Sequence, residues 1–254
     1  MKLHFRKYGQ GQPLIILHGL FGQSDNWNSL AKQFAENGFE VYAVDQRNHG
    51  LSPKSDEWDY QVMSDDLHEL IMDNQLKNVI LLGHSMGGKT VMQYTLQHPE
   101  MVDKLIVADI SPKYYPLQHG DVVKALRAID FNIVKTRKEA EAILSEYVND
   151  YGTKQFLLKN IYWKENGLLD WRFNVKIILE KMENVGQAIT ADESVDVPAL
   201  FIRGENGGYV LDEDLNMIHD LFPRSMLETI AGAGHWVHAE KPKAFFETVM
   251  NFIK

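Results

Sequence analysis

Ser85, a serine flanked closely by glycines, is the residue of this chain with the clearest capacity for chemistry. It lies in the stretch Gly-His-Ser-Met-Gly at residues 83–87. The run of strand-forming residues at 78–82 predicts a buried strand before it, and the pattern after it predicts a helix to about Gln97. A serine between a strand and a helix is typical of a nucleophile elbow, a strained turn that exposes the hydroxyl. The alternative is an ordinary turn rich in glycine and serine, but the flanking elements favour a nucleophile.

A serine nucleophile needs a base to take its proton, and His235 is the best placed of the ten histidines. It follows the last predicted strand, in a Gly-rich loop late in the chain, where the base of such enzymes is expected. His238 is its nearby rival, and a surface-loop histidine is the alternative interpretation. His84 flanks the nucleophile, and we interpret it as structural support.

The acid that orients the base is harder to assign. Many hydrolases place an aspartate in the loop after the strand predicted at 199–202, but residues 204–208 contain none. We favour Asp109, at the end of the strand that follows the elbow helix. Asp212, which resembles a helix cap, and Glu205 are the alternatives. A turn or cap role is the other interpretation of Asp109.

An oxyanion hole requires two backbone N–H groups beside the nucleophile. We expect them from Met86, just after the serine, and from Leu20 in the loop after the strand at 14–17, with Phe21 as the alternative to Leu20. Aromatic residues of the middle region could line an acyl pocket, although each could equally form core there. The residues expected to contact the substrate are His18, Gly19, Phe21, Trp163 and Trp236.

The polar stretch at 45–52 follows another predicted strand. We expect Arg47 to pair with a carboxylate or with backbone carbonyls rather than to take part in catalysis. His49 could lie near the rim of the site, but a structural role is favoured.

The elements that must position these residues alternate between strand and helix over residues 1–111 and again over 196–254. This rhythm predicts a mostly parallel, doubly wound sheet, in which ligand sites lie at the carboxyl ends of strands. Between them, residues 112–195 show mainly helical patterns, with a turn at 164–167 that suggests a small hairpin. We interpret 112–195 as a helical cap inserted between two sheet strands; further sheet-flanking helices are the alternative.

The composition sets limits on the class of protein. The 254 residues are 44% hydrophobic, which is ample for one core with an inserted subdomain, and the net charge of −9 is spread along the chain. That charge argues against nucleic acid or an anionic membrane as partner. The chain has no cysteine, so disulfides and thiol chemistry are excluded, and we expect no metal or other cofactor. No leader or long apolar run is evident, which makes a cytoplasmic location the expectation.

The whole chain resembles the α/β-hydrolase fold family, and it is similar in several stretches to the bacterial YbfF-type esterases and the related α/β hydrolase domain-containing protein 11. The elbow is common to the fold. The stretches Arg-Asn-His-Gly at 47–50 and Trp-Arg-Phe-Asn-Val at 171–175 are more discriminating. The resemblance implies Asp109 as the acid. It also implies a serine in the later loop where this chain has Gly207, so a hydrogen bond from that position is in doubt.

The resemblance implies an esterase acting on short- or medium-chain acyl esters, or on acyl-CoA thioesters. Small-molecule esters are then the expected partners, and the oligomeric state is not predicted. Two alternatives stay open. One is a C–C bond hydrolase or a lyase of the same fold, and the other is a small-molecule receptor that retains the triad without turning over its ligand.

Overall fold

A computed structural model describes residues 1–116 and 120–254, so residues 117–119 of the predicted cap lie outside the described residues. Seven strands form one sheet in the order β1-β3-β2-β4-β5-β8-β9. Only β1 runs antiparallel to its neighbour; every other pairing is parallel. The strands are β1 (Phe5–Tyr8), β2 (Gln12–Leu17), β3 (Phe39–Val44), β4 (Val79–His84), β5 (Val102–Ala108), β8 (Ala199–Gly204) and β9 (Ser225–Ile230).

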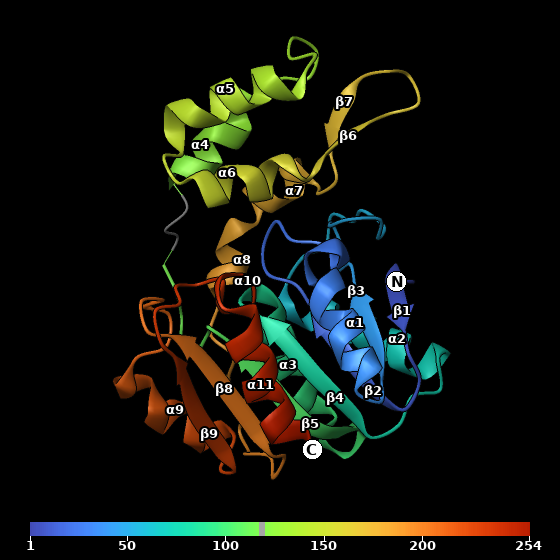
Figure 1. Ribbon diagram of the computed structural model, residues 1–254, viewed down its shortest axis with the longest axis vertical. Helices are drawn as coiled ribbons and strands as arrows, with labels where there is room; N and C mark the ends of the chain where they lie inside the picture. The colour runs from blue at the N-terminus through green and yellow to red at the C-terminus, as the bar shows by residue number, and fades with distance from the viewer. Residues whose placement is uncertain (117–119) are drawn as a thin grey trace.

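Helices cover both faces of this sheet, because the apolar side chains of its central strands alternate between two cores. Leu14 and Ile16 of β2 belong to the core that includes α1 and α11, whereas Ile15 and Leu17 belong to the core on the other face, which includes α2, α3 and α9. Figure 1 shows this layered arrangement. The helices of the core are α1 (Asn28–Glu36), α2 (Tyr60–Asp73), α3 (Met86–Gln97), α9 (Leu215–Leu221), α10 (Val237–Glu240) and α11 (Pro242–Ile253), with short 3-10 turns η1 (Ser24–Trp27), η2 (Pro99–Met101) and η3 (Asp212–Asp214).

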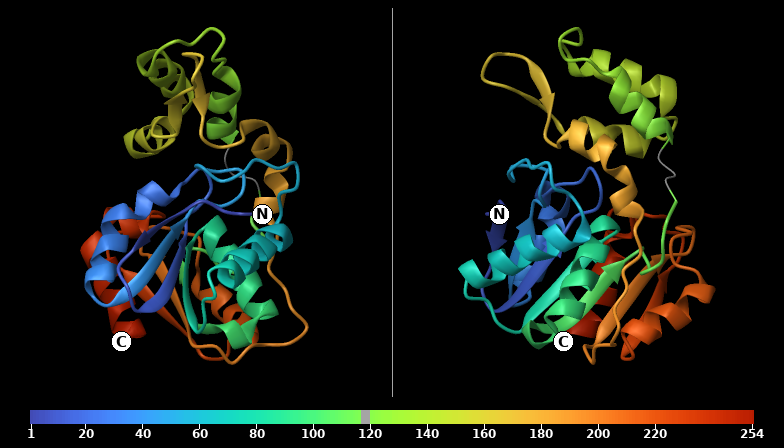
Figure 2. Two further views of the ribbon diagram at one scale, coloured as in Figure 1. Left: turned by 90° about the vertical axis from the view of Figure 1, so that its right-hand side faces the viewer. Right: turned by 180° about the vertical axis from the view of Figure 1, so that it is seen from behind.

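The chain between β5 and β8 lies above the carboxyl ends of the strands, as Figures 1 and 2 show. Its longest helix begins with a capping box, in which the Thr136 hydroxyl accepts from the Glu139 N–H and the Glu139 carboxylate accepts from the Thr136 N–H. This region contains α4 (Gly120–Ala128), α5 (Arg137–Tyr147), α6 (Tyr151–Leu158), the hairpin β6 (Ile161–Trp163) and β7 (Leu169–Trp171), α7 (Val175–Glu180) and α8 (Met182–Gly186). Its treatment as a separate cap over 112–195 remains our proposal.

Two local expectations for this region differ from the structure. The helical pattern of the sequence predicts one helix from about Val175 to Val185, but the structure breaks it at Lys181 into α7 and α8. The break allows the Asn184 side chain to donate to the Trp58 carbonyl at 2.7 Å, a contact with the core that the local pattern does not encode. The helix α6, in addition, occupies residues that the sequence left unassigned.

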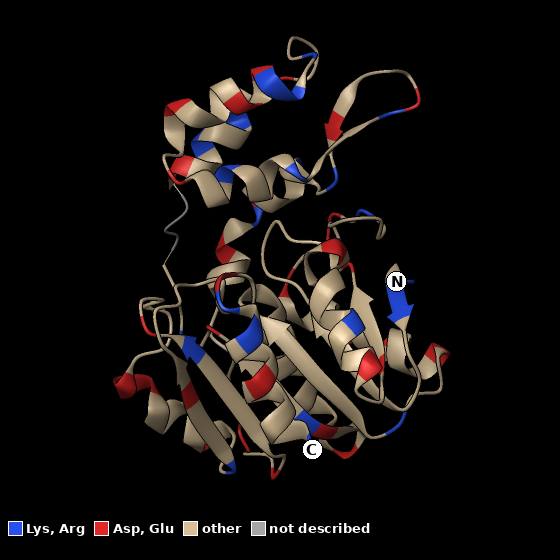
Figure 3. Cartoon of the chain, in the orientation of Figure 1, with Lys and Arg blue, Asp and Glu red and all other residues tan. Residues whose placement is uncertain are grey.

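Figure 3 shows Lys and Arg residues interspersed with Asp and Glu residues along the chain, both in the sheet region and in the part between β5 and β8. Among the described residues, no helix is long and apolar enough to cross a membrane.

Arg47 is paired as the sequence predicted. Its guanidinium is buried and donates to both carboxylate oxygens of Asp66, at 2.6 and 2.9 Å, and to the Glu57 carbonyl at 2.9 Å. This bidentate pair fixes the polar loop after β3 against α2.

Asp66→Ala is therefore expected to destabilise the protein strongly, because it leaves the Arg47 guanidinium buried without a counter-charge. The free energy of unfolding should fall by about 3–5 kcal/mol, measured by urea denaturation at neutral pH. Asp65→Ala removes an exposed carboxylate next to it and should change stability by less than about 1 kcal/mol. Equal effects of the two substitutions would contradict a structural role for the pair.

Candidate active site

Ser85 occupies a strained turn between β4 and α3. Its φ of 52° lies in the left-handed region that non-glycine residues rarely adopt. The glycines on either side make this turn possible: a Cβ on Gly83 would meet the Gly87 carbonyl oxygen at 2.2 Å, and one on Gly87 would meet the Leu17 carbonyl oxygen at 2.5 Å. No larger residue fits between strand and helix there, so the elbow geometry follows directly from the two glycines.

The parallel sheet brings Asp109 beside the elbow, because His84 of β4 pairs in register with Ala108 of β5. The residue after each strand end is therefore Ser85 on one strand and Asp109 on its neighbour. The backbone of Asp109 also lies in the left-handed region, with a φ of 50°. Its N–H donates to the Ile202 carbonyl of β8 at 2.7 Å.

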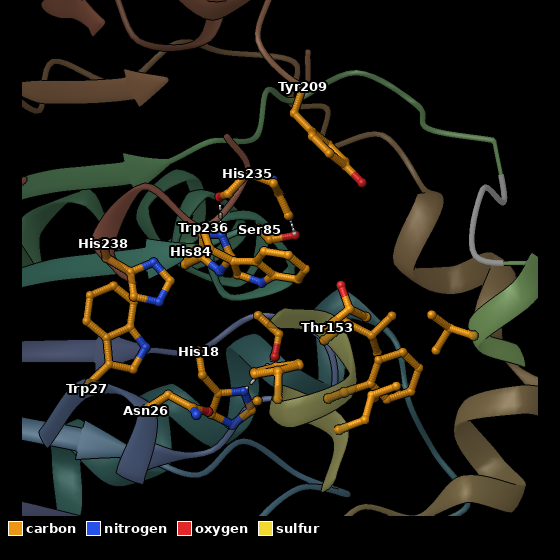
Figure 4. Close-up of a pocket in the computed structure, with 17 residues that line it drawn as sticks. His18, Asn26, Trp27, His84, Ser85, Thr153, Tyr209, His235, Trp236 and His238 are labelled. Atoms are coloured by element: carbon orange, nitrogen blue, oxygen red, sulfur yellow. Dashed lines mark hydrogen bonds between the residues drawn. The ribbon is translucent and has the colours of Figure 1, made fainter. Parts of the chain in front are cut away.

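Three side chains form a continuous hydrogen-bonded chain. Nδ1 of His235 lies 2.7 Å from Oδ2 of Asp109, and Nε2 lies 3.1 Å from Oγ of Ser85. Figure 4 shows the imidazole directed at the serine hydroxyl. With the carboxylate accepting the Nδ1 proton, Nε2 presents its lone pair to the hydroxyl, which is the arrangement of a nucleophile, base and acid.

The electrostatics of Asp109 differ from those of an exposed carboxylate. It is fully buried, and this burial raises its pKa to about 7, although the Gly204 N–H that donates to Oδ1 at 3.0 Å opposes the rise. Gly207 adds no further donor, and a Cβ there would meet Oδ2 of Asp109 at 2.6 Å. The buried carboxylate therefore depends on one backbone N–H and on His235.

The alternative acids lie elsewhere. Asp212 is 82% exposed and pairs with Arg203 at 2.7 Å. Glu205 accepts from the Gly232 N–H at 2.7 Å. Of the three candidate acids, Asp109 is therefore the one whose carboxylate contacts the His235 imidazole.

The other histidines around Ser85 have structural contacts. His84 donates from Nε2 to the backbone carbonyl of His235 at 2.9 Å, and burial lowers its pKa well below the usual value. It is thus neutral and fixes the loop that carries the base. His238 is buried and stacks on Trp27, with ring centroids 4.1 Å apart.

The loop after β2 supplies one side of the oxyanion hole. Phe21, the alternative donor, already donates its N–H to Nε2 of His49 at 3.2 Å. Among the described residues, none accepts from the Leu20 N–H, and Met86 is the first residue of α3, whose N–H has no partner within the helix. These two N–H groups are those we assign to an oxyanion.

His49 is held in place by the same loop. It donates from Nδ1 to the Arg47 carbonyl at 2.9 Å, and burial lowers its pKa to about 3, which keeps the ring neutral. Its contacts are those of a support for the oxyanion loop.

A cavity of about 240 Å³ opens in front of Ser85. His18, Gly19, Phe21 and Trp236 line it, although the His18 ring is already bonded to the Gly19 carbonyl and the Gln46 N–H. Thr153 reaches it from α6 of the cap, on the side opposite His235 in Figure 4.

Trp163 is the one predicted substrate-binding residue that lies elsewhere. It is 58% exposed on the β6 strand and lines neither of the two cavities at Ser85, so it is removed from the proposed set. The prediction failed because the three-residue strand turns this side chain away from the site, which its residue type alone does not reveal.

One residue beside the base was not predicted. The Tyr209 ring stacks on the His235 ring with centroids 3.9 Å apart, and Tyr115 donates its hydroxyl to the Tyr209 carbonyl. Nothing in the local sequence marks Tyr209, because its position depends on the path of the loop after β8.

Comparisons with known proteins identify the family of the chain. A model of the α/β hydrolase fold matches residues 12–242. Esterase YbfF of Escherichia coli is 37% identical over 262 residues, covering 100% of this chain and 99% of that protein. The sn-1-specific diacylglycerol lipase ABHD11 of Xenopus laevis is 37% identical over 251 residues, covering 96% of this chain and 80% of that protein.

A solved structure described as a marine microorganism esterase superposes with a TM-score of 0.97 at 46% identity, covering 99% of each chain. The resemblance seen in the sequence is confirmed by these matches. The chain therefore belongs to the α/β-hydrolase fold family and is an enzyme of the serine-hydrolase type.

Proposed function

We propose that this protein is an esterase that hydrolyses short- to medium-chain acyl esters or acyl thioesters through an acyl-enzyme on Ser85. The observation that carries the proposal is the hydrogen-bonded chain from Ser85 through His235 to Asp109. The names of the esterase and lipase relatives support the hydrolysis of esters. The cytoplasmic location stays a prediction.

In the proposed reaction, Ser85 Oγ attacks the ester carbonyl while Nε2 of His235 takes the hydroxyl proton. The N–H groups of Leu20 and Met86 donate to the oxyanion that forms. The imidazolium then protonates the leaving oxygen of an ester or the leaving sulfur of a thioester, and the alcohol or thiol departs. Water, deprotonated by the same nitrogen, cleaves the acyl-enzyme and restores Ser85. Asp109 accepts from Nδ1 throughout and stabilises the positive charge on the ring.

Hydrolysis of p-nitrophenyl butyrate and of butyryl-CoA tests the proposal. We expect release of p-nitrophenol or of free thiol well above the uncatalysed rate. A C–C bond hydrolase or lyase of this fold should leave both compounds intact, and a receptor should bind them without product. Absence of turnover on every ester and thioester would exclude the esterase assignment.

The pH profile of kcat/KM is a further prediction. The carboxyl of Asp109, with its pKa raised to about 7 by burial, loses its charge as the pH falls and then no longer stabilises the positive charge that forms on the His235 ring. Activity should therefore decline below about pH 7, to roughly one tenth of the plateau one unit lower. Initial rates on p-nitrophenyl butyrate, with circular dichroism to verify folding at each pH, measure this. A profile that stays flat to about pH 5.5 would contradict the raised pKa.

A further inference from the structure

Ser85 stands where two separate cavities meet. The larger, of about 240 Å³, opens toward the loop after β2 and α6. The smaller, of about 50 Å³, lies on the other side, toward α3 and α8. The Ser85 and Tyr209 side chains line both, so Tyr209 stands between them while its ring stacks on His235.

The position of the base distinguishes the two cavities. The group that leaves during acylation must have its oxygen beside Nε2 of His235, which protonates it. His235 and Trp236 line the larger cavity, whereas the described residues that line the smaller one include neither. The leaving alcohol therefore belongs in the larger cavity, and the acyl chain, on the other side of the carbonyl carbon, points into the smaller one.

The smaller cavity is apolar and narrow. Ile110, Met182 and Val185 contribute aliphatic side chains, and the Tyr60 hydroxyl is already bonded, because it donates to the Val185 carbonyl at 2.7 Å. A volume of about 50 Å³ is several times the ~10–15 Å³ that holds one water molecule, which leaves room for a few carbon atoms.

A buried lysine holds the wall of the smaller cavity in place. Lys89, one turn after Ser85 on α3, is fully buried and donates to the Lys113 carbonyl at 2.8 Å, to the Gly186 carbonyl at 3.4 Å and to the Gln187 carbonyl. These carbonyls belong to the segments that enter and leave the cap. Lys89 thus ties both segments to the elbow helix and restricts the expansion of the cavity between them.

We propose that the smaller cavity is the acyl site and limits the enzyme to acyl groups of about two to four carbons, while the larger cavity accepts the alcohol. The inference rests on the proposed esterase function. It adds which cavity holds the acyl group of the substrate and which holds the alcohol. It makes Met182 and Val185 the residues that set acyl-chain length.

The test compares kcat/KM on p-nitrophenyl acetate, butyrate, hexanoate and octanoate. For the wild type we expect a maximum at acetate or butyrate and a fall of at least tenfold by octanoate. Met182→Ala lengthens the smaller cavity. It should raise the ratio of kcat/KM on p-nitrophenyl octanoate to kcat/KM on p-nitrophenyl butyrate at least tenfold. Val185→Ala removes less volume from the same wall and should shift the ratio in the same direction, and it serves if Met182→Ala does not fold.

Phe156→Ala is the matched control, because Phe156 lines only the larger cavity. It should leave the ratio of kcat/KM on octanoate to kcat/KM on butyrate unchanged. It should alter the ratio of kcat/KM on p-nitrophenyl butyrate to kcat/KM on methyl butyrate, which differ in the alcohol. The acyl assignment is overturned if Phe156→Ala rather than the small-cavity variants changes the length profile, or if the wild type prefers octanoate. Failure to hydrolyse any of these esters would instead overturn the proposed function, and the inference with it.

Discussion

Ser85→Ala is expected to abolish ester hydrolysis, lowering kcat by roughly 10⁵- to 10⁶-fold while leaving KM nearly unchanged. The substitution removes the only atom that forms the proposed covalent bond, yet it keeps the cavities and the oxyanion donors. Alanine is no more strained than serine at a φ of 52°, so the variant should fold. Steady-state rates on p-nitrophenyl butyrate give the comparison.

The control for this loss is Ser145→Ala, which removes an exposed hydroxyl on α5 of the cap. Its kcat should equal that of the wild type. If Ser85→Ala retained more than about one hundredth of the wild-type kcat, the elbow serine would not be the nucleophile, and water activated by His235 would have to take its place.

Asp109→Asn is expected to lower kcat by about 10⁴-fold. The amide cannot accept from Nδ1 of His235 in the way the carboxylate does, so the ring can adopt the tautomer that places a proton on Nε2, toward Ser85. The ring then no longer accepts the hydroxyl proton. Values of kcat on p-nitrophenyl butyrate are measured up to about pH 9. They separate a kcat that is lower at every pH from a pH profile that is only displaced.

Asp212→Asn is the matched control, because Asp212 is exposed and pairs with Arg203 rather than with a catalytic group. It should change kcat by less than about twofold. A larger loss from Asp212→Asn than from Asp109→Asn would overturn the assignment of the acid.

The fold and the central site residues could be predicted because local sequence and sheet topology determine them. Gly83 and Gly87 permit the tight turn at Ser85, where a larger residue would clash, and the apolar runs before Ser85 and Asp109 predict buried strands. Parallel strands end at the same edge of a sheet. The residues that follow neighbouring strands therefore lie close together, however many residues separate them in the chain. The membership of the α/β-hydrolase fold family is accordingly visible from sequence alone.

The contacts of the cap could not be predicted, because they depend on packing between elements far apart in the chain. Trp163 is an aromatic residue in an aromatic-rich region, yet its strand exposes it. Tyr209 has no motif around it, yet it stacks on the base and lines both cavities. Lys89 was visible as part of the elbow helix, but its contacts with Lys113 and Gln187 arise only when the two ends of the cap come together.

Covalent labelling tests the central claim, that Ser85 is the nucleophile, most directly. Diethyl p-nitrophenyl phosphate should react so that the Ser85 Oγ–P bond forms and p-nitrophenolate leaves, one equivalent per chain. The account predicts that peptide mass spectrometry finds the diethylphosphoryl group on the peptide that carries Ser85, that esterase activity is lost in parallel, and that Ser85→Ala takes up no label. Labelling at another residue, or full esterase activity in a protein fully labelled at Ser85, would contradict it.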